Sequence, residues 1–300
     1  MRPGSRRRAL LAAGIGLALS VALALPASAA PALPDLVMLH SVMTMLDSQS
    51  DHVPDAVTGW YIDPATNTVV VSTTDDAAAR AFTVGARAVR IKHVSARPVL
   101  LSDLHGGDTI TTSEGGRCSV GFNATSGRVR YVITAGHCTK LGGTWSGPDG
   151  QPIGPVAKSA FPGHDYGLVE VASPAWDQTH DVDADSGFLT VAGSVPAAVG
   201  DRVCLSGSTS GFHCGHVEAV NETVNYGNGD IVRGLTRTSV CAEAGDSGGP
   251  FMSGNQAQGT LSGGSGGCLL GGESYYQPIQ EVLKAYGLTL VTGRQVPDER

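Results

Sequence analysis

Short runs of apolar and β-branched residues, separated by Gly, Ser, Asn and Asp, recur along the chain after residue 100. Many such runs in succession, bounded by turn residues, are typical of the strands of a β-sandwich or β-barrel. We expect strands at 129–134, 167–171, 188–191, 201–205, 216–220, 230–236 and 260–261. The pattern therefore predicts an all-β domain.

One helix is expected near the C-terminus. Apolar residues recur there at helical spacing between Pro278 and Gly287. Proline suits the first turn of a helix and glycine its end, so the helix should lie between these two residues.

The segment 31–103 has a different pattern and contains no Cys. Residues 59–63 and 68–71 flank a turn and predict a hairpin, and residues 77–90 predict a helix followed by a strand. We expect a small α+β unit that is removed by processing between Leu101 and Gly106, with Leu104 or His105 as the new N-terminus.

The first residues have the organisation of an export signal. Arginines within residues 1–8 precede a run of small and apolar residues at 9–25, and Ala27-Ser28-Ala29 supplies a cleavage pattern. We predict a signal peptide over 1–29, a propeptide over 30–103 and a mature domain over 104–300. An uncleaved anchor is the alternative, but the run is short for a membrane span. The export route, general or twin-arginine, stays open.

Composition narrows the class further. The 300 residues include 41 Gly, only 16% are charged, and the net charge is −7. An acidic chain has no electrostatic footprint for nucleic acid, and no other apolar run is long enough to span a membrane. We expect a secreted monomer that binds neither nucleic acid nor, after processing, a membrane.

All six Cys follow residue 117: Cys118, Cys138, Cys204, Cys214, Cys241 and Cys268. An even number of Cys in an exported chain indicates disulfides. Because no C-x-x-C pair or zinc spacing is present, no metal site is expected. Spacing alone leaves fifteen pairings open.

The sequence Gly245-Asp246-Ser247-Gly248-Gly249-Pro250 carries the candidate nucleophile, Ser247. Glycines leave the hydroxyl accessible, and the N–H groups of Gly245 and Ser247 could converge on a developing oxyanion. The same letters satisfy the nucleophile elbow of α/β-hydrolases, in which the catalytic His follows the Ser. All nine His here precede Ser247, which argues against that alternative.

A serine hydroxyl needs a base, and the base needs a carboxylate that fixes its tautomer. His137 stands at the end of a predicted strand, next to Cys138, and Asp165 immediately precedes another predicted strand. These two residues are the candidates. The non-catalytic alternatives are that Ser247 lies in an ordinary Gly-rich turn, that His137 is a surface residue and that Asp165 is a solvated turn residue.

TAGHC around His137, DYGLV at Asp165 and GDSGGP around Ser247, in this order, resemble the chymotrypsin-like serine proteases. The spacings of 28 and 82 residues, together with GGRCSVGFN, NETVNYGNGDIVRGL, CAEAGDSGGP and SGGSGGC, resemble the streptogrisin and α-lytic protease branch. Residues 59–73 resemble the prodomain of those proteases.

The resemblance implies two six-stranded antiparallel β-barrels, at about 104–195 and 196–282, with the site between them. It also implies three disulfides, Cys118–Cys138, Cys204–Cys214 and Cys241–Cys268. The prodomain would be a transient intramolecular partner that assists folding.

The resemblance further implies an endopeptidase acting on protein or peptide substrates without a cofactor. Ser247 would attack, His137 move the proton, Asp165 orient His137, and the Gly245 and Ser247 amides hold the oxyanion. The substrate would be bound by Ala242, Glu243, Ala244, Ser262, Gly263, Gly264, Glu273 and Ser274.

Specificity is expected to favour medium to large apolar residues before the cut, because the expected pocket walls are small and uncharged. One of Glu273 and Ser274 should lie near the pocket floor. A buried Glu273 would instead favour basic residues. The other functional class is an inactive protease-like binding protein, which would typically lack one of the three catalytic residues.

Overall fold

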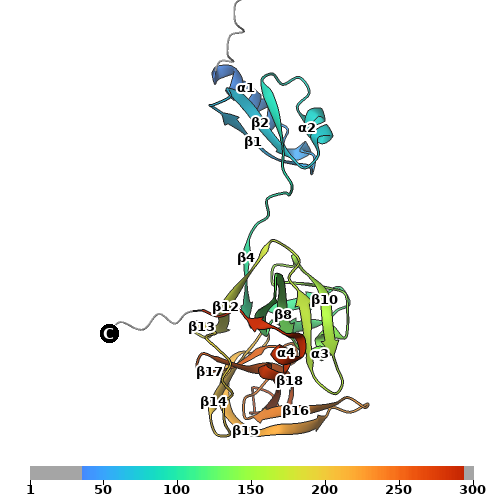
Figure 1. The fold of residues 1–300 in the computed structure, drawn as a ribbon, viewed down its shortest axis with the longest axis vertical. Coiled ribbons are helices and arrows are strands. Elements are labelled where there is room, and N and C mark those ends of the chain that lie inside the picture. Colours follow the sequence, from blue (N-terminus) through green and yellow to red (C-terminus); the bar gives the residue numbers. More distant parts are fainter. Residues whose placement is uncertain (1–35, 294–300) are drawn as a thin grey trace, which may run out of the picture. The chain divides into compact units, whose positions relative to one another are not determined.

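The computed structural model describes residues 36–293, so the predicted signal peptide lies outside the described residues. The chain forms two compact units, of which the first ends at Pro98 and the second begins at Val99 (Figure 1). Each unit is considered by itself.

The first unit is a three-stranded sheet covered by helices. Its elements are α1 (Leu36–Asp47), a 3-10 turn (Ser50–His52), β1 (Val57–Asp63), β2 (Thr68–Thr73), α2 (Asp76–Phe82) and β3 (Val89–His93). The predicted hairpin is β1–β2, and α2 is the crossover that brings β3 parallel to β2. Helix α1 was not predicted. Its buried Leu39, Val42 and Leu46 complete the core.

The first half of the second unit contains ten strands and one short helix. They are β4 (Ser102–Gly106), β5 (Thr109–Thr112), β6 (Arg117–Ser119), β7 (Phe122–Ser126), β8 (Val129–Thr134), α3 (Gly136–Thr139), β9 (Thr144–Ser146), β10 (Pro152–Ala160), β11 (Tyr166–Glu170), β12 (Trp176–Ala184) and β13 (Gly187–Thr190). Seven of these strands and the C-terminal β20 (Thr289–Leu290) form an eight-stranded sheet, β20-β7-β8-β11-β10-β9-β5-β6, and the other three form the sheet β13-β12-β4. This arrangement differs from the expected six strands, partly because the C-terminal strand β20 pairs with β7.

The second half is a closed six-stranded barrel in the order β14-β15-β16-β19-β18-β17, as expected. Its strands are β14 (Arg202–Gly207), β15 (Gly211–Asn225), β16 (Ile231–Thr238), β17 (Pro250–Ser253), β18 (Gln256–Ser265) and β19 (Glu273–Pro278). The mostly β architecture that the sequence predicts is confirmed.

The predicted C-terminal helix is confirmed as α4 (Ile279–Tyr286), which follows Pro278 and ends at Gly287 in the left-handed conformation. Its Ile279 and Val282 are buried in a core that also contains Phe122 and Ile133 of the first half and Met252 of the barrel. Helix α4 therefore packs where the two halves meet (Figure 1). Over residues 36–293, no helix has the length and apolar character needed to cross a membrane.

Candidate active site

A buried carboxylate and an imidazole meet between α3 and β11. The Asp165 side chain is fully buried and lies 2.9 Å (Oδ2) and 3.1 Å (Oδ1) from His137 Nδ1. Its Oδ1 also accepts a 2.8 Å hydrogen bond from the His137 backbone N–H. Because a carboxylate only accepts, the Nδ1 proton lies toward Asp165 and Nε2 is left for other partners. This is the geometry that fixes an imidazole as a base.

A line of hydroxyl groups continues from Asp165 into the second half. Ser262 donates a 2.6 Å hydrogen bond to Asp165 Oδ2 and accepts one of 3.0 Å from the Tyr226 hydroxyl. Burial raises the pKa of Tyr226 above its ordinary value, so this hydroxyl remains a donor. The carboxylate is therefore supplied with hydrogen bonds from both halves.

The backbone of Asp165 is held separately, by Gln277 at the end of β19. The fully buried Gln277 accepts a 2.9 Å hydrogen bond from the Asp165 N–H through Oε1 and donates one of 2.7 Å to Glu281 of α4. Glu281 in turn lies 2.6 Å from His164 Nδ1. Side chains from the barrel and α4 thus fix the position of the catalytic candidate.

Ser247 lies in a loop that is shaped by its neighbour Asp246. The buried Asp246 carboxylate accepts hydrogen bonds from the backbone N–H groups of Thr209, Ser210 and Glu243 (2.8–2.9 Å) and from the Ser210 hydroxyl (2.6 Å). Within residues 36–293, the N–H groups of Gly245 and Ser247 donate no hydrogen bond. Two unpartnered amides beside a serine are what an oxyanion requires.

Gly245 has to be glycine. Its φ is +103°, and a Cβ there would lie 2.3 Å from Thr209 Oγ1. The loop can therefore present its amide only without a side chain at this position.

A cavity of about 360 Å³ opens beside Ser247. Its lining contains five of the predicted substrate-binding residues and four others, and is made of Ala242, Glu243, Ala244, Ser247, Leu261, Gly263, Gly264, Ser265 and Gly266. The Glu243 carboxylate is tied back, since it accepts a 2.8 Å hydrogen bond from the Cys268 N–H. The cavity is otherwise uncharged.

Neither Glu273 nor Ser274, one of which is expected near the pocket floor, is among the residues that line this cavity. Ser274 is fully buried, and its hydroxyl bonds to Val240 O (2.7 Å) and to the Thr238 hydroxyl (2.9 Å). Glu273 lies on the opposite face of β19, where its carboxylate accepts hydrogen bonds from Ser265 (3.2 Å) and Tyr275 (2.7 Å). The two side chains are therefore engaged by other groups of the barrel.

A second cavity, of about 520 Å³, lies next to His137. It is lined by His137, Lys140, Leu141, Phe161, Asp165, Tyr226, Asp230, Ser262, Gly263 and Gly264. Gly263 and Gly264 line both cavities, so the cavity beside Ser247 and the cavity beside His137 adjoin along β18.

The structure pairs Cys118 with Cys138, Cys204 with Cys214, and Cys241 with Cys268, the same pairs that the resemblance implies. Two Cys–His clusters are close enough to suggest metal ligation, but every Cys in them is disulfide-bonded. Neither cluster offers a thiolate to a metal.

Sequence reasoning missed Asp246, Gln277 and Tyr226. The sequence did contain a signal for Asp246. A carboxylate between Gly245 and Ser247 is expected to accept hydrogen bonds from nearby backbone N–H groups. Gln277 and Tyr226 had none, since their partners are far away in the sequence.

This fold and cleft define a chymotrypsin-like serine protease architecture. Residues 106–285 match the trypsin family, and residues 36–89 match the alpha-lytic protease prodomain. The chain belongs to the trypsin family and is of the streptogrisin type, with a prodomain.

The relatives include streptogrisin-C of Streptomyces griseus, 46% identical over 81% of this chain and 54% of that protein. Streptogrisin-A of the same organism is 38% identical over 79% of each chain. The chain thus spans only about half the length of streptogrisin-C. Among solved structures, Thermobifida fusca protease A is 44% identical with a TM-score of 0.60, covering 64% of this chain and all of that one.

Proposed function

We propose that this chain is the precursor of a secreted serine endopeptidase that cleaves peptide bonds through an acyl-enzyme. The observation that carries the proposal is the bonding of Asp165 to His137 in the cleft where Ser247 lies beside two unpartnered amides. The relatives' names and the prodomain match support the same activity.

In the proposed reaction, His137 Nε2 takes the proton of the Ser247 hydroxyl as its oxygen attacks the scissile carbonyl. The Gly245 and Ser247 amides stabilise the negative oxygen of the tetrahedral intermediate. Asp165 keeps the imidazole in the required tautomer and stabilises its cation. The proton then passes from His137 to the leaving amine, and water repeats the sequence to release the acid.

We propose that the residue before the cut is a medium or large apolar one, bound in the 360 Å³ cavity against Leu261 and glycine walls. One relative is named glutamyl endopeptidase 2, but no His, Lys or Arg lines this cavity in the described part of the chain. A glutamate side chain would therefore lose its hydration without gaining a positive partner.

We propose that the mature domain starts with β4, and the contacts of this strand support the proposal. The Ser102 N–H donates a 2.8 Å hydrogen bond to Ala175 O, and Leu104 is fully buried. Cutting before Leu104 or His105 would divide a paired strand. The exposed Leu100 and Leu101 directly precede β4, so we propose cleavage after Leu101, at a residue that suits the proposed pocket.

Secretion is part of the same proposal and is supported by the signal-like start of the sequence and the prodomain. The three disulfides fit an oxidising compartment.

Replacement of Ser247 by Ala tests the mechanism. We expect the hydrolysis of a chromogenic peptide with Leu before the cut to fall by several orders of magnitude, as expected when one member of a catalytic unit is lost. Ser113→Ala, at an exposed serine that lines neither cavity of the site, is the matched control and should keep most of the activity. A sulfonyl fluoride should label the wild type and the control but not the Ser247 variant. Near-normal hydrolysis by a folded Ser247→Ala protein would refute the proposal.

A further inference from the structure

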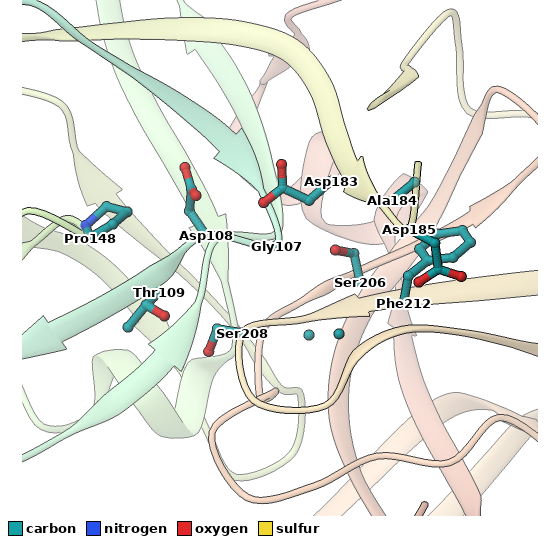
Figure 2. Close-up of a pocket in the computed structure, with 12 residues that line it drawn as sticks. Gly107, Asp108, Thr109, Pro148, Asp183, Ala184, Asp185, Ser206, Ser208 and Phe212 are labelled. Atoms are coloured by element: carbon teal, nitrogen blue, oxygen red, sulfur yellow. The ribbon is translucent and has the colours of Figure 1, made fainter. Parts of the chain in front are cut away.

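A third cavity, of about 390 Å³, shares no residue with the catalytic cleft. It is formed where three segments meet: 107–109 between β4 and the start of β5, 183–185 at the end of β12, and 206–208 at the end of β14 (Figure 2). Nothing in the proposed protease mechanism uses it.

The cavity is acidic. Asp108, Asp183 and Asp185 line it, and no Lys or Arg is among its lining residues in the described chain. Burial raises the pKa of Asp108 to about 6, the charge of Asp183 adds to that shift, and burial also raises the pKa of Asp183. The nearest imidazole, His105, has Nδ1 3.8 Å from Asp108 Oδ2.

The two inner carboxylates have oxygens to spare. Asp108 accepts one hydrogen bond, of 2.7 Å, from the His105 backbone N–H. Asp183 accepts none from any residue between 36 and 293. In Figure 2 the carboxyl groups of Asp108 and Asp183 lie on either side of Gly107.

Ser206 adds an independent observation. Its side chain is only 3% exposed and lines the cavity, yet its hydroxyl has no hydrogen-bond partner in the described part of the chain. The oxygen is not sealed in the core, so it is open to the cavity and free to bind a ligand there. Figure 2 shows this oxygen turned toward the side of the cavity on which Asp183 lies.

We propose that Asp108, Asp183 and Ser206 bind a hard divalent cation, Ca²⁺, in this cavity. Carboxylate and hydroxyl oxygens are ligands that Ca²⁺ accepts in irregular geometry, and the cavity has room for the waters that complete six to eight ligands. Mg²⁺ demands near-ideal octahedral geometry and gives up water reluctantly, so a site assembled from three separate segments of the chain suits it less.

The bound ion would brace the turn that supports the Ser247 loop. Ser208, two residues after Ser206, donates a 3.1 Å hydrogen bond from its hydroxyl to Gly245 O. Thr209 and Ser210 in turn bond Asp246. Fixing Ser206 therefore restrains the segment on which the oxyanion amides depend.

Calorimetric titration with CaCl₂ at pH 8 tests the site. The full chain carrying Ser247→Ala is the background for every variant, so that self-digestion plays no part. We expect one saturable site with a dissociation constant of about 10⁻⁴ to 10⁻³ M, typical of extracellular calcium sites, and weaker binding of MgCl₂.

Asp183→Asn keeps the shape of the side chain and should weaken Ca²⁺ binding at least tenfold. Ser206→Ala should weaken it several-fold and carries the test if the first variant fails to fold. The matched control is Asp103→Asn, an exposed carboxylate outside the cavity, which should bind as the background does. No saturation up to 10 mM CaCl₂, unchanged affinity in a folded cavity variant, or equal affinity for Mg²⁺ would each overturn the proposal.

Discussion

Replacing Gln277 by Met perturbs Asp165, the carboxylate of the proposed triad, without touching the substrate. Gln277 lines neither cavity of the cleft, but its amide holds the Asp165 backbone N–H at 2.9 Å. Met has a similar length, accepts hydrogen bonds only weakly through its sulfur and cannot donate one to Glu281. The variant therefore tests whether the barrel positions Asp165.

The expected loss of stability follows from the Asp165 backbone N–H, which the variant leaves without its acceptor. A buried N–H without an acceptor costs about 1–3 kcal/mol, which for a domain of this size lowers the melting temperature by about 2–4 °C per kcal/mol. The Asp165 side chain keeps its bonds to His137 and Ser262, so it should shift rather than detach. We expect kcat to fall about tenfold, equivalent to about 1.4 kcal/mol, with KM little changed.

A matched control is available in Gln258. This side chain is 4% exposed, accepts a 2.7 Å hydrogen bond from the Ala197 N–H and donates one of 2.9 Å to Val195 O. Gln258→Met should lose comparable stability while kcat stays within about twofold of the wild type. Peptide hydrolysis and thermal melts of the mature enzymes decide the matter. A folded Gln277→Met enzyme with normal kcat, or an equal loss in both variants, would refute the reasoning.

Two further predictions concern specificity and processing. Among peptides that differ only in the residue before the cut, those with Leu or Phe should have kcat/KM at least tenfold above those with Arg or Glu. The Glu273→Gln variant should keep these ratios within about twofold. If the wild type instead prefers Arg and the variant loses that preference, Glu273 lies in the pocket. N-terminal sequencing of the mature enzyme should give Ser102, and a start at Leu104 would show that β4 opens during processing.

The elements that were predicted correctly from the sequence are those that are determined by residues within the element or next to it. Helix α4 lies between Pro278 and Gly287 because proline fixes its own φ and glycine readily adopts the left-handed conformation that ends a helix. The β1–β2 hairpin is determined by the turn between its strands. Helix α1 lacked comparable signals, since it has no acidic residue in its first turn and no basic one in its last. Its stability comes from packing on the sheet, which no local pattern reveals.

The pocket floor shows the limit of reasoning from strand spacing. Adjacent residues of a strand point to opposite faces, so only one of Glu273 and Ser274 could face inward. Ser274 does so, but it faces Thr238 and Val240 rather than the cavity. The register of β18 and β19 shifts between Leu261 and Gly263, and a shift of this kind cannot be read from either strand alone.

The relative placement of the catalytic candidates depends on β6, in which the sequence analysis singled out Cys118 but not Ser119. Ser119 of β6 donates hydrogen bonds from its N–H to Ser247 O (2.8 Å) and from its hydroxyl to Gly245 O (3.0 Å). Its own carbonyl accepts one of 2.9 Å from Thr134, at the end of the strand that leads to His137. The adjacent Cys118–Cys138 disulfide joins the same two places covalently. The loops of the base and the nucleophile are thus both fastened to one short strand, so their alignment does not depend only on the packing of the two halves.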